Sequence, residues 1–172
     1  VSFKLHKGEV LGIAGMLGSG RTELLRSVIG VDGMDGGEII VKGQSVKRPN
    51  PQTMHRLGVG YTSEDRKHTG LVQLLSCHAN LCLAGLKKMG RWGWISQRQE
   101  TPFVRKQIDG LQIKVGHASK PVSSLSGGNQ QKIVVGNWLN IEPSVILFDE
   151  PSRGVDVQAK QQIYKTIWEL SQ

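Results

Sequence analysis

The sequence has few of the features that mark secreted, membrane-spanning or disulfide-bonded proteins. It contains two cysteines, and aromatic residues make up 5% of the chain. No apolar run reaches the roughly 18 residues that a transmembrane helix needs, and we expect no signal peptide, because no charged segment leads into an apolar one at the start. Cys77 and Cys82 lack a second Cys/His pair at metal-ligand spacing. They are therefore predicted to be reduced, apolar-like thiols of a cytosolic protein, not parts of a disulfide framework or a zinc site.

Acidic residues are scarce relative to basic ones. The chain of 172 residues has 14 Asp and Glu against 22 Lys and Arg, which gives a net charge of +8. This excess favours anionic partners, namely nucleotide phosphates, anionic lipid headgroups or nucleic acid, without choosing among them. The length suits one domain with a sizeable core. The start at Val1 instead of Met leads us to expect a piece of a longer polypeptide.

The first motif is a glycine-rich segment between an apolar run, residues 10–14, and a stretch with helical spacing, residues 23–29. The apolar run predicts a buried strand. The segment between them contains Gly15, Gly18, Ser19, Gly20, Arg21 and Thr22, and it fits G-x4-G-K-[ST] except that Arg21 replaces the lysine. Glycines let backbone N–H groups surround an anion at the positive end of the following helix. A glycine turn that binds nothing is the alternative, but the flanking strand and helix favour a phosphate loop whose Thr22 hydroxyl contacts Mg²⁺.

Two carboxylates form the second motif. Residues 145–148 are all apolar, which predicts a strand buried on both faces as in a parallel sheet, and Asp149 and Glu150 follow where it ends. Open α/β sheets bind ligands at this edge. We therefore expect Asp149 to hold Mg²⁺ through its water shell opposite Thr22, and Glu150 to accept a proton from, or orient, the water that attacks a γ-phosphate. The alternative is that both residues cap the next helix, because Pro151 marks a turn there.

A third motif begins a helix. Ser126 is a suitable N-cap residue, and apolar residues between 133 and 139 supply the buried face of the helix. Gly127 and Gly128 leave the N–H groups of the first turn uncovered by side chains, so a phosphate could approach them closely.

Around these motifs the sequence predicts an α/β core interrupted by an all-helical insertion. Further strands are expected at 1–5, 38–41 and 59–62, with a short helix at 52–57. Helices are expected from about 78 to 138. A last helix, 157–170, carries Ile163, Tyr164, Ile167 and Trp168 on one face.

Together the three motifs resemble the ATP-binding cassette (ABC) family, and the resemblance covers nearly the whole chain. Residues 125–131 (Leu-Ser-Gly-Gly-Asn-Gln-Gln) are similar to the family's signature sequence, and residues 154–156 (Gly-Val-Asp) to the loop that contacts the opposing nucleotide domain. Residues 20–23, 63–67 and 153–156 are most similar to the second of two tandem cassettes in the ATPases of bacterial ribose, xylose and galactose importers.

The resemblance implies an α/β fold of the P-loop NTPase type. Such a fold has a RecA-like parallel sheet core, a small antiparallel β-subdomain and a helical subdomain that carries the signature sequence. The core would comprise approximately residues 1–77 and 141–172, and the helical subdomain residues 78–140. The resemblance also places expected flanking strands outside the chain at both ends.

The resemblance further implies a function, in which hydrolysis of ATP drives sugar uptake. ATP with Mg²⁺ would lie between the phosphate loop of one cassette and the signature helix of another. The implied partners are a first cassette, transmembrane permease subunits and, indirectly, a periplasmic sugar-binding protein, with no nucleic acid; the location would be cytoplasmic, on the inner face of the plasma membrane. Glu150 is the implied catalytic residue, and Thr22, Asp149 and Glu64 are the implied metal ligands. The implied nucleotide-binding residues are Gly15, Gly18, Ser19, Gly20, Arg21, Thr22, Glu23, Glu64, Asp149, Ser126, Gly127, Gly128 and Asp156.

Two residues depart from the family's pattern. Arg21 is a wide, planar cation where the family has the compact charge of lysine, and Glu64 stands where it usually has Gln. A carboxylate close to phosphates costs Coulomb energy unless Mg²⁺ or Arg66 offsets it. An alternative is therefore a degenerate clamp that supplies its signature helix to a partner without hydrolysing efficiently itself.

A soluble cassette protein that acts on nucleic acid is a third hypothesis. Basic residues between 87 and 106 are interleaved with Trp92 and Trp94, a combination that binds nucleic acid by stacking and phosphate contacts. A solvated helical face is the commoner explanation of such a pattern. The five histidines show no pairing at ligand spacing, so we expect them to be ordinary surface or core residues.

Overall fold

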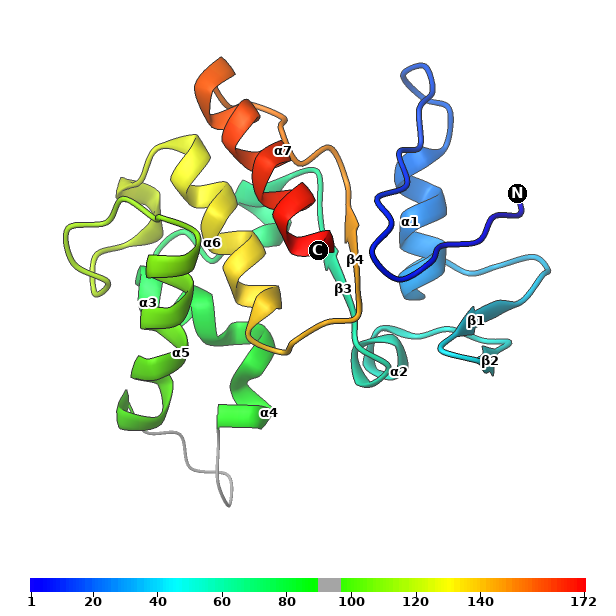
Figure 1. Ribbon diagram of the computed structural model, residues 1–172, viewed down its shortest axis with the longest axis horizontal. Coiled ribbons are helices and arrows are strands. Elements are labelled where there is room, and N and C mark those ends of the chain that lie inside the picture. The colour runs from blue at the N-terminus through cyan, green and yellow to red at the C-terminus, as the bar shows by residue number, and fades with distance from the viewer. Residues whose placement is uncertain (90–96) are drawn as a thin grey trace.

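The computed structural model describes residues 1–89 and 97–172. The two paired strands β3 and β4 run through the middle of the molecule (Figure 1). Helices α3 to α6 lie on one side of them, and α1 with the β1–β2 hairpin lies on the other. The helices are α1 (Arg21–Ile29), α2 (Pro51–Arg56), α3 (Cys77–Cys82), α4 (Leu86–Met89), α5 (Gln97–Gly110), α6 (Gly127–Leu139) and α7 (Val157–Ser171), with single turns η1 (Arg66–Gly70), η2 (Leu83–Gly85) and η3 (Val122–Ser124). The strands are β1 (Ile39–Val41), β2 (Gln44–Val46), β3 (Val59–Thr62) and β4 (Val145–Phe148).

The parallel pair β3–β4 creates the edge at which the predicted site residues meet. Val59 lies opposite Val145 and Thr62 opposite Phe148, so both strands end at the same level. The loop that contains Glu64 and the loop that contains Asp149 and Glu150 therefore leave the sheet side by side. The strands predicted at 59–62 and 145–148 are confirmed.

The antiparallel pair β1–β2 is a hairpin with a two-residue turn. Val41 lies opposite Gln44, and the two residues between them, Lys42 and Gly43, both have positive φ, 50° and 78°. Positive φ at both central positions is typical of a type I′ turn, whose twist matches that of the strands. The strand predicted at 38–41 is confirmed, and β2 is an addition that periodicity did not indicate.

The strands predicted at 1–5 and 10–14 are wrong. Neither segment forms a strand, and the side chains of Val10, Leu11 and Ile13 are exposed. A strand needs a neighbour to accept its ladder hydrogen bonds, and within the described residues β4 pairs with β3 alone. For the same reason the prediction that residues 145–148 are buried on both faces is wrong, because all four are only partly buried.

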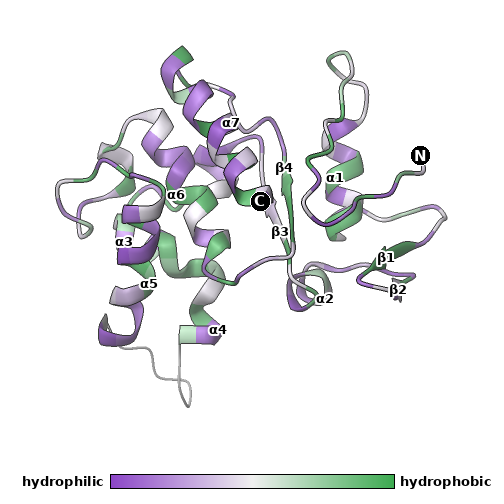
Figure 2. Ribbon diagram, in the orientation of Figure 1, coloured by the Kyte–Doolittle hydropathy of each residue, from purple (hydrophilic) through white to green (hydrophobic). Residues whose placement is uncertain are grey.

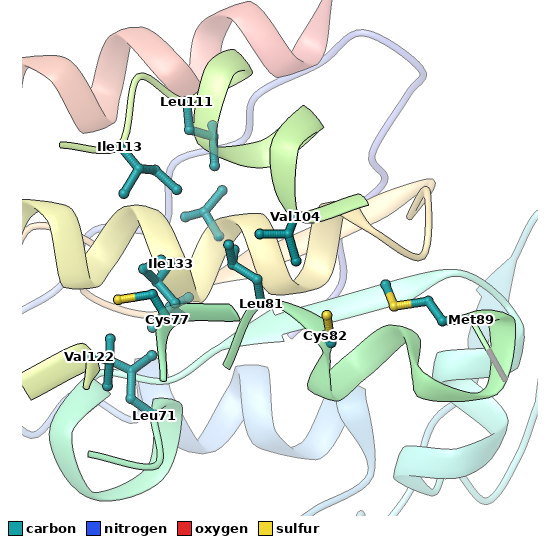
Figure 3. Packing of buried hydrophobic residues seen from close by; sticks show 12 residues of the cluster. Leu71, Cys77, Leu81, Cys82, Met89, Val104, Leu111, Ile113, Val122 and Ile133 are labelled. Atoms are coloured by element: carbon teal, nitrogen blue, oxygen red, sulfur yellow. The ribbon is translucent and has the colours of Figure 1, made fainter. Parts of the chain in front are cut away.

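The helices between residues 77 and 139 enclose the larger hydrophobic core. Leu81 from α3, Ile133 from α6 and Val122 from η3 are completely buried in one cluster (Figure 3). Both cysteines lie in this core as free thiols, as predicted. In the described part of this stretch the predicted helices are present, and the only extended pairing is a single bridge between Ser76 and Pro121.

A smaller core supports the other side of the strands. Ile29 of α1, Met54 of α2 and Val59 of β3 are buried together there. Strands β1 and β4 consist largely of hydrophobic residues, whereas much of α5 and α7 is hydrophilic (Figure 2). Within the described residues, no helix combines the length and the apolar character that crossing a bilayer requires.

Helix α7 is present as predicted, but its apolar face is only partly used. Ile163 is buried, whereas Tyr164 and Trp168 are exposed. The helix packs on α6 through its N-terminal half, where Ala159 approaches Gly128.

Candidate functional site

The centre of the site is the carboxylate of Asp149, which is 3% exposed. Thr22 Oγ1 donates a hydrogen bond to Asp149 Oδ1 at 3.1 Å, and Tyr61 Oη donates to Asp149 Oδ2 at 3.0 Å. Thr22 is the second residue of α1, and Asp149 directly follows β4. The structure thus brings together the hydroxyl and the carboxylate that the sequence assigned to Mg²⁺, although 127 positions separate them.

Tyr61 is a site residue that the sequence did not reveal. Burial, and then its hydrogen bond to Asp149, raise the pKa of the Tyr61 phenol, so it remains a neutral donor. Its position follows from strand register: Tyr61 lies opposite Leu147, and Asp149 projects from the same side two residues later. The register of two distant strands was the missing signal.

The glycine loop leaves backbone N–H groups accessible at the start of α1. Gly18 and Gly20 have φ of 76° and 85°, and no atom lies within 4 Å of a Cβ built on either. Gly20 is the N-cap residue and supplies no side chain to the first turn. A cradle that a Cβ would fill, beside a hydroxyl–carboxylate pair, fits a nucleotide phosphate with Mg²⁺.

Glu150 forms an ion pair with Arg21. Arg21 Nη1 lies 2.8 Å from Glu150 Oε1, and the two side chains are 32% and 39% exposed. Glu150 has φ of 43°, a left-handed conformation that non-glycine residues rarely adopt and that turns the chain sharply after the strand. The residue that departs from the lysine pattern therefore holds the predicted catalytic carboxylate beside the glycine loop.

Glu64 pairs with Arg153 instead of Arg66. The offsetting cation for this carboxylate is therefore a residue of the loop after Glu150. The guanidinium of Arg66 is directed to the same loop, where it donates to backbone carbonyls. Glu23 lies in the first turn of α1, where a carboxylate is favoured by the helix dipole.

The signature segment lies at the start of α6, as predicted. Ser126 occupies the N-cap position, but its Oγ accepts from the side chain of Asn129 and caps no backbone N–H group. A Cβ on Gly127 would lie 2.7 Å from Arg66 Nη2, and one on Gly128 would lie 2.6 Å from Ala159 Cβ. Gly128 is thus required by close packing on α7, and Gly127 lies in close contact with the Arg66 guanidinium, a reason for both glycines that the sequence did not indicate.

Asp156 and the signature residues lie apart from the glycine loop. Asp156 is the N-cap of α7, where its Oδ1 accepts from Ala159 N at 2.8 Å. In the described parts of the chain, no hydrogen bond or ion pair links Ser126, Gly127, Gly128 or Asp156 to residues 15–23. The candidate residues form two groups, one around Asp149 and one at the start of α6.

A further cluster of ionisable groups lies in the helical part. His78 Nε2 and Glu100 Oε2 are 2.8 Å apart, and Cys82 lies one turn beyond His78 on α3, with ligand atoms of all three within 4.8 Å of one another. The sequence did not indicate the contact between His78 and Glu100, because Glu100 comes from a different helix. Burial raises the pKa of the Cys82 thiol to about 12, and Cys82 belongs to the hydrophobic core. We interpret the His78–Glu100 pair as a structural contact that holds α3 against α5.

The basic stretch between 87 and 106 is described in part. Lys88 Nζ pairs with Glu142 at 3.0 Å and lies 5.9 Å from the centre of the Phe103 ring. Trp92 and Trp94, on which the nucleic-acid hypothesis depended, lie outside the described residues.

The fold and the glycine-loop–carboxylate edge define an ATP-binding cassette of the P-loop NTPase class. A dimeric, post-hydrolysis cassette bound to ADP and Pi superposes with a TM-score of 0.82 at 21% identity, covering 99% of this chain and 72% of that one. A cassette of an ABC transporter in its ADP conformation gives a TM-score of 0.78 at 22% identity, covering 99% and 69%. The chain belongs to the ABC transporter family, whose sequence model matches residues 1–153.

Curated relatives resemble the chain over nearly all its length. The ribose import ATP-binding protein of Geobacillus kaustophilus is 43% identical over 171 residues, covering 99% of this chain and 35% of the relative. That of Bacillus licheniformis is 42% identical over 171 residues, with the same coverage. The chain thus spans about a third of the length of these relatives.

Proposed function

We propose that this chain is an ATP-binding and ATP-hydrolysing domain of a bacterial sugar importer, and that it is the second of two tandem cassettes. The observation that carries the proposal is the contact of Thr22 and Tyr61 with the buried Asp149 beside an accessible glycine loop. The relatives named as ribose import ATP-binding proteins support the transport role. The division into a core, residues 1–77 and 141–172, and a helical part, residues 78–140, belongs to the same proposal.

The proposed partners follow from the same assignment. A first cassette would face the start of α6, and permease subunits would bring the domain to the cytoplasmic face of the plasma membrane. A periplasmic sugar-binding protein would act through the permease. The signature residues Ser126, Gly127 and Gly128, together with Asp156, would serve the nucleotide shared with that first cassette.

The residues around Asp149 divide the chemistry between them. The N–H groups of Gly18, Gly20 and the first turn of α1 bind phosphate oxygens, and Thr22 with Asp149 holds Mg²⁺. The chemistry that bound Mg²⁺ would supply is positive charge beside the phosphates. Tyr61 keeps the Asp149 carboxylate in place by donating to its second oxygen. Glu64 would reach the metal after release of its ion pair with Arg153.

Arg21 and Glu150 act as a linked pair in this proposal. A phosphate on the glycine loop competes with Glu150 for the guanidinium, because both are anions within reach of the same cation. Once Arg21 turns to the phosphate, Glu150 is free to orient a water and accept its proton. The partial exposure of both side chains makes this exchange inexpensive, since exposed ion pairs contribute about 0–1 kcal/mol.

The experiment is Glu150→Gln in the full-length protein that contains this chain. Single-turnover hydrolysis of the ATP bound at this chain's own glycine loop should fall by about 10²–10⁴, whereas ATP binding there should be retained. Glu142→Gln is the matched control, because Glu142 pairs with Lys88 on the exposed surface. Unchanged turnover in the Glu150 variant would contradict hydrolysis at this site. It would support the alternative in which the domain supplies its signature helix to a partner without hydrolysing ATP efficiently itself.

A further inference from the structure

Arg66 is a buried cation where three segments meet: the Glu64 loop, the loop after Glu150 and the start of α6. The proposed function assigns different roles to these segments. The residue is 8% exposed and is the first residue of the turn η1, directly after the Glu64 loop. Its Nη1 donates to the carbonyl of Arg153 at 2.5 Å, and its Nη2 donates to the carbonyl of Gly154 at 2.9 Å. These carbonyls belong to the loop that follows Glu150.

The same guanidinium lies close to the start of α6. A Cβ on Gly127 would be 2.7 Å from Arg66 Nη2 and 3.1 Å from the carbonyl oxygen of Gly154. A side chain at 127 would therefore require the guanidinium to shift and would also press on the carbonyl of Gly154. Gly154 has φ of 65°, which lets its carbonyl face the arginine.

The buried positive charge of Arg66 is compensated by backbone carbonyls and not by a carboxylate. No carboxylate lies within ion-pair distance of Arg66 among the described residues, and Arg66 Nε has no hydrogen-bond partner. Burial correspondingly lowers the pKa of the guanidinium. An incompletely paired buried charge is costly, so its presence at a candidate site requires an explanation.

We propose that Arg66 is a positioning residue that clamps the Arg153–Gly154 loop to the first turn of α6. The clamp makes the Glu64 loop, the loop after Glu150 and the signature segment move as one unit. This inference rests on the proposed function, because it assigns to Arg66 the coupling between this chain's own nucleotide site and the surface that faces the other cassette.

The geometry predicts that lysine cannot replace Arg66. Two N–H groups of one planar fork reach two successive carbonyls, whereas an ammonium is a compact charge on a flexible stem. If attraction of a phosphate by positive charge were the role of Arg66, lysine would retain it. Arg66→Lys therefore separates a clamp from a simple electrostatic contribution.

The first test compares Arg66→Lys and Arg66→Met with the control Lys67→Met in the full-length protein. Lys67 is the exposed neighbour, so its substitution removes the same charge without touching either carbonyl. Both Arg66 variants should lose about tenfold to a hundredfold in kcat for ATP hydrolysis, with KM changed less than about threefold, because misplacement acts on the reacting geometry. The control should hydrolyse ATP at the wild-type rate.

The second test needs no variant and no nucleotide. In native-state hydrogen exchange with increasing denaturant, the hydrogen-bonded amides of Thr69 and Gly70, of Arg153 and of Gln130 in the wild-type protein should share one opening free energy and one denaturant dependence. Three independent openings would overturn the proposal even if the Arg66 variants fail to fold. Full kcat in Arg66→Lys would also overturn it. If the wild-type protein does not hydrolyse ATP and yet the three segments show a common opening, the proposed function is refuted. The positioning role of Arg66 is then still supported.

Discussion

Removal of the Tyr61 hydroxyl is the perturbation that tests the centre of the site most directly. Asp149 is buried and takes two hydroxyl donors, one on each oxygen. Tyr61→Phe leaves the ring in place and removes the donor to Oδ2. A hydrogen bond to a charged group contributes about 1.5–3 kcal/mol, and the buried oxygen keeps no other donor among the described residues.

The expected loss converts into a measurable shift. For a domain of this size, about 1 kcal/mol corresponds to about 2–4 °C in Tm, so Tyr61→Phe should lower Tm by about 3–12 °C. Thermal and urea unfolding would measure it. Tyr164→Phe is the matched control, because Tyr164 is 48% exposed and its hydroxyl contacts only Ser152 Oγ among the described residues, at 3.1 Å. Its cost should stay within about 0.5 kcal/mol.

A double-mutant cycle assigns the loss to Asp149. Tyr61→Phe should cost much less in an Asp149→Asn background, because the charged acceptor is already gone. In the full-length protein the Phe variant should also bind Mg²⁺ with ATP about tenfold more weakly, since the orientation of the carboxylate is lost, whereas ATP binding without metal should hardly change. Additive unfolding free energies, or a cost no greater than that of Tyr164→Phe, would refute the reasoning.

Three further outcomes are expected. First, the folded-state pKa of Tyr61 is raised above the unfolded value of about 10, so the stabilisation by Tyr61 is complete below about pH 10 and is lost as the pH rises above that value. Above about pH 10 the free energy of unfolding of wild type should fall by up to about 1.4 kcal/mol per pH unit more than that of Tyr61→Phe, as measured by urea unfolding. Second, Gly128→Ala should cost about 1–3 kcal/mol, because the new Cβ would lie 2.6 Å from a methyl carbon of α7, whereas Gly116→Ala, with open space at its Cβ, should be nearly neutral in the same denaturant titration. Third, Leu81→Ala should cost about 2–5 kcal/mol, since Leu81 is fully buried between α3 and α6, and equal costs for Leu81→Ala and the exposed Leu74→Ala would contradict this view of the core.

Local sequence patterns predicted several elements correctly. The apolar run 145–148 followed by two carboxylates was recognisable as a strand end, and 59–62 as a strand, because both depend on short-range periodicity. The run 10–14 carried an equally clear pattern and yet forms no strand. Periodicity reports which side chains could be buried, but a strand also needs a neighbouring strand, which the local pattern does not specify.

The candidate site shows the same division. The glycine loop, Thr22, Asp149 and Glu150 were identifiable because each belongs to a motif with fixed spacing along the chain. Tyr61 was missed because its relation to Asp149 depends on the register of β3 against β4. The close contacts of Gly127 were not predictable from the sequence, since the guanidinium of Arg66 and the carbonyl of Gly154 that approach it come from distant segments.

The sequence alone determined the chemistry that is available, namely a phosphate-binding turn, a pair of carboxylates and a glycine-rich helix start. Tertiary structure decided which of these groups contact one another: Tyr61 with Asp149, Arg21 with Glu150 and Arg66 with the loop at 153–154. The physical reason is the range of the interactions. Turn conformation and helix capping depend on neighbouring residues, whereas the pairing of buried charges and hydroxyls depends on strand register and packing between segments far apart in the chain.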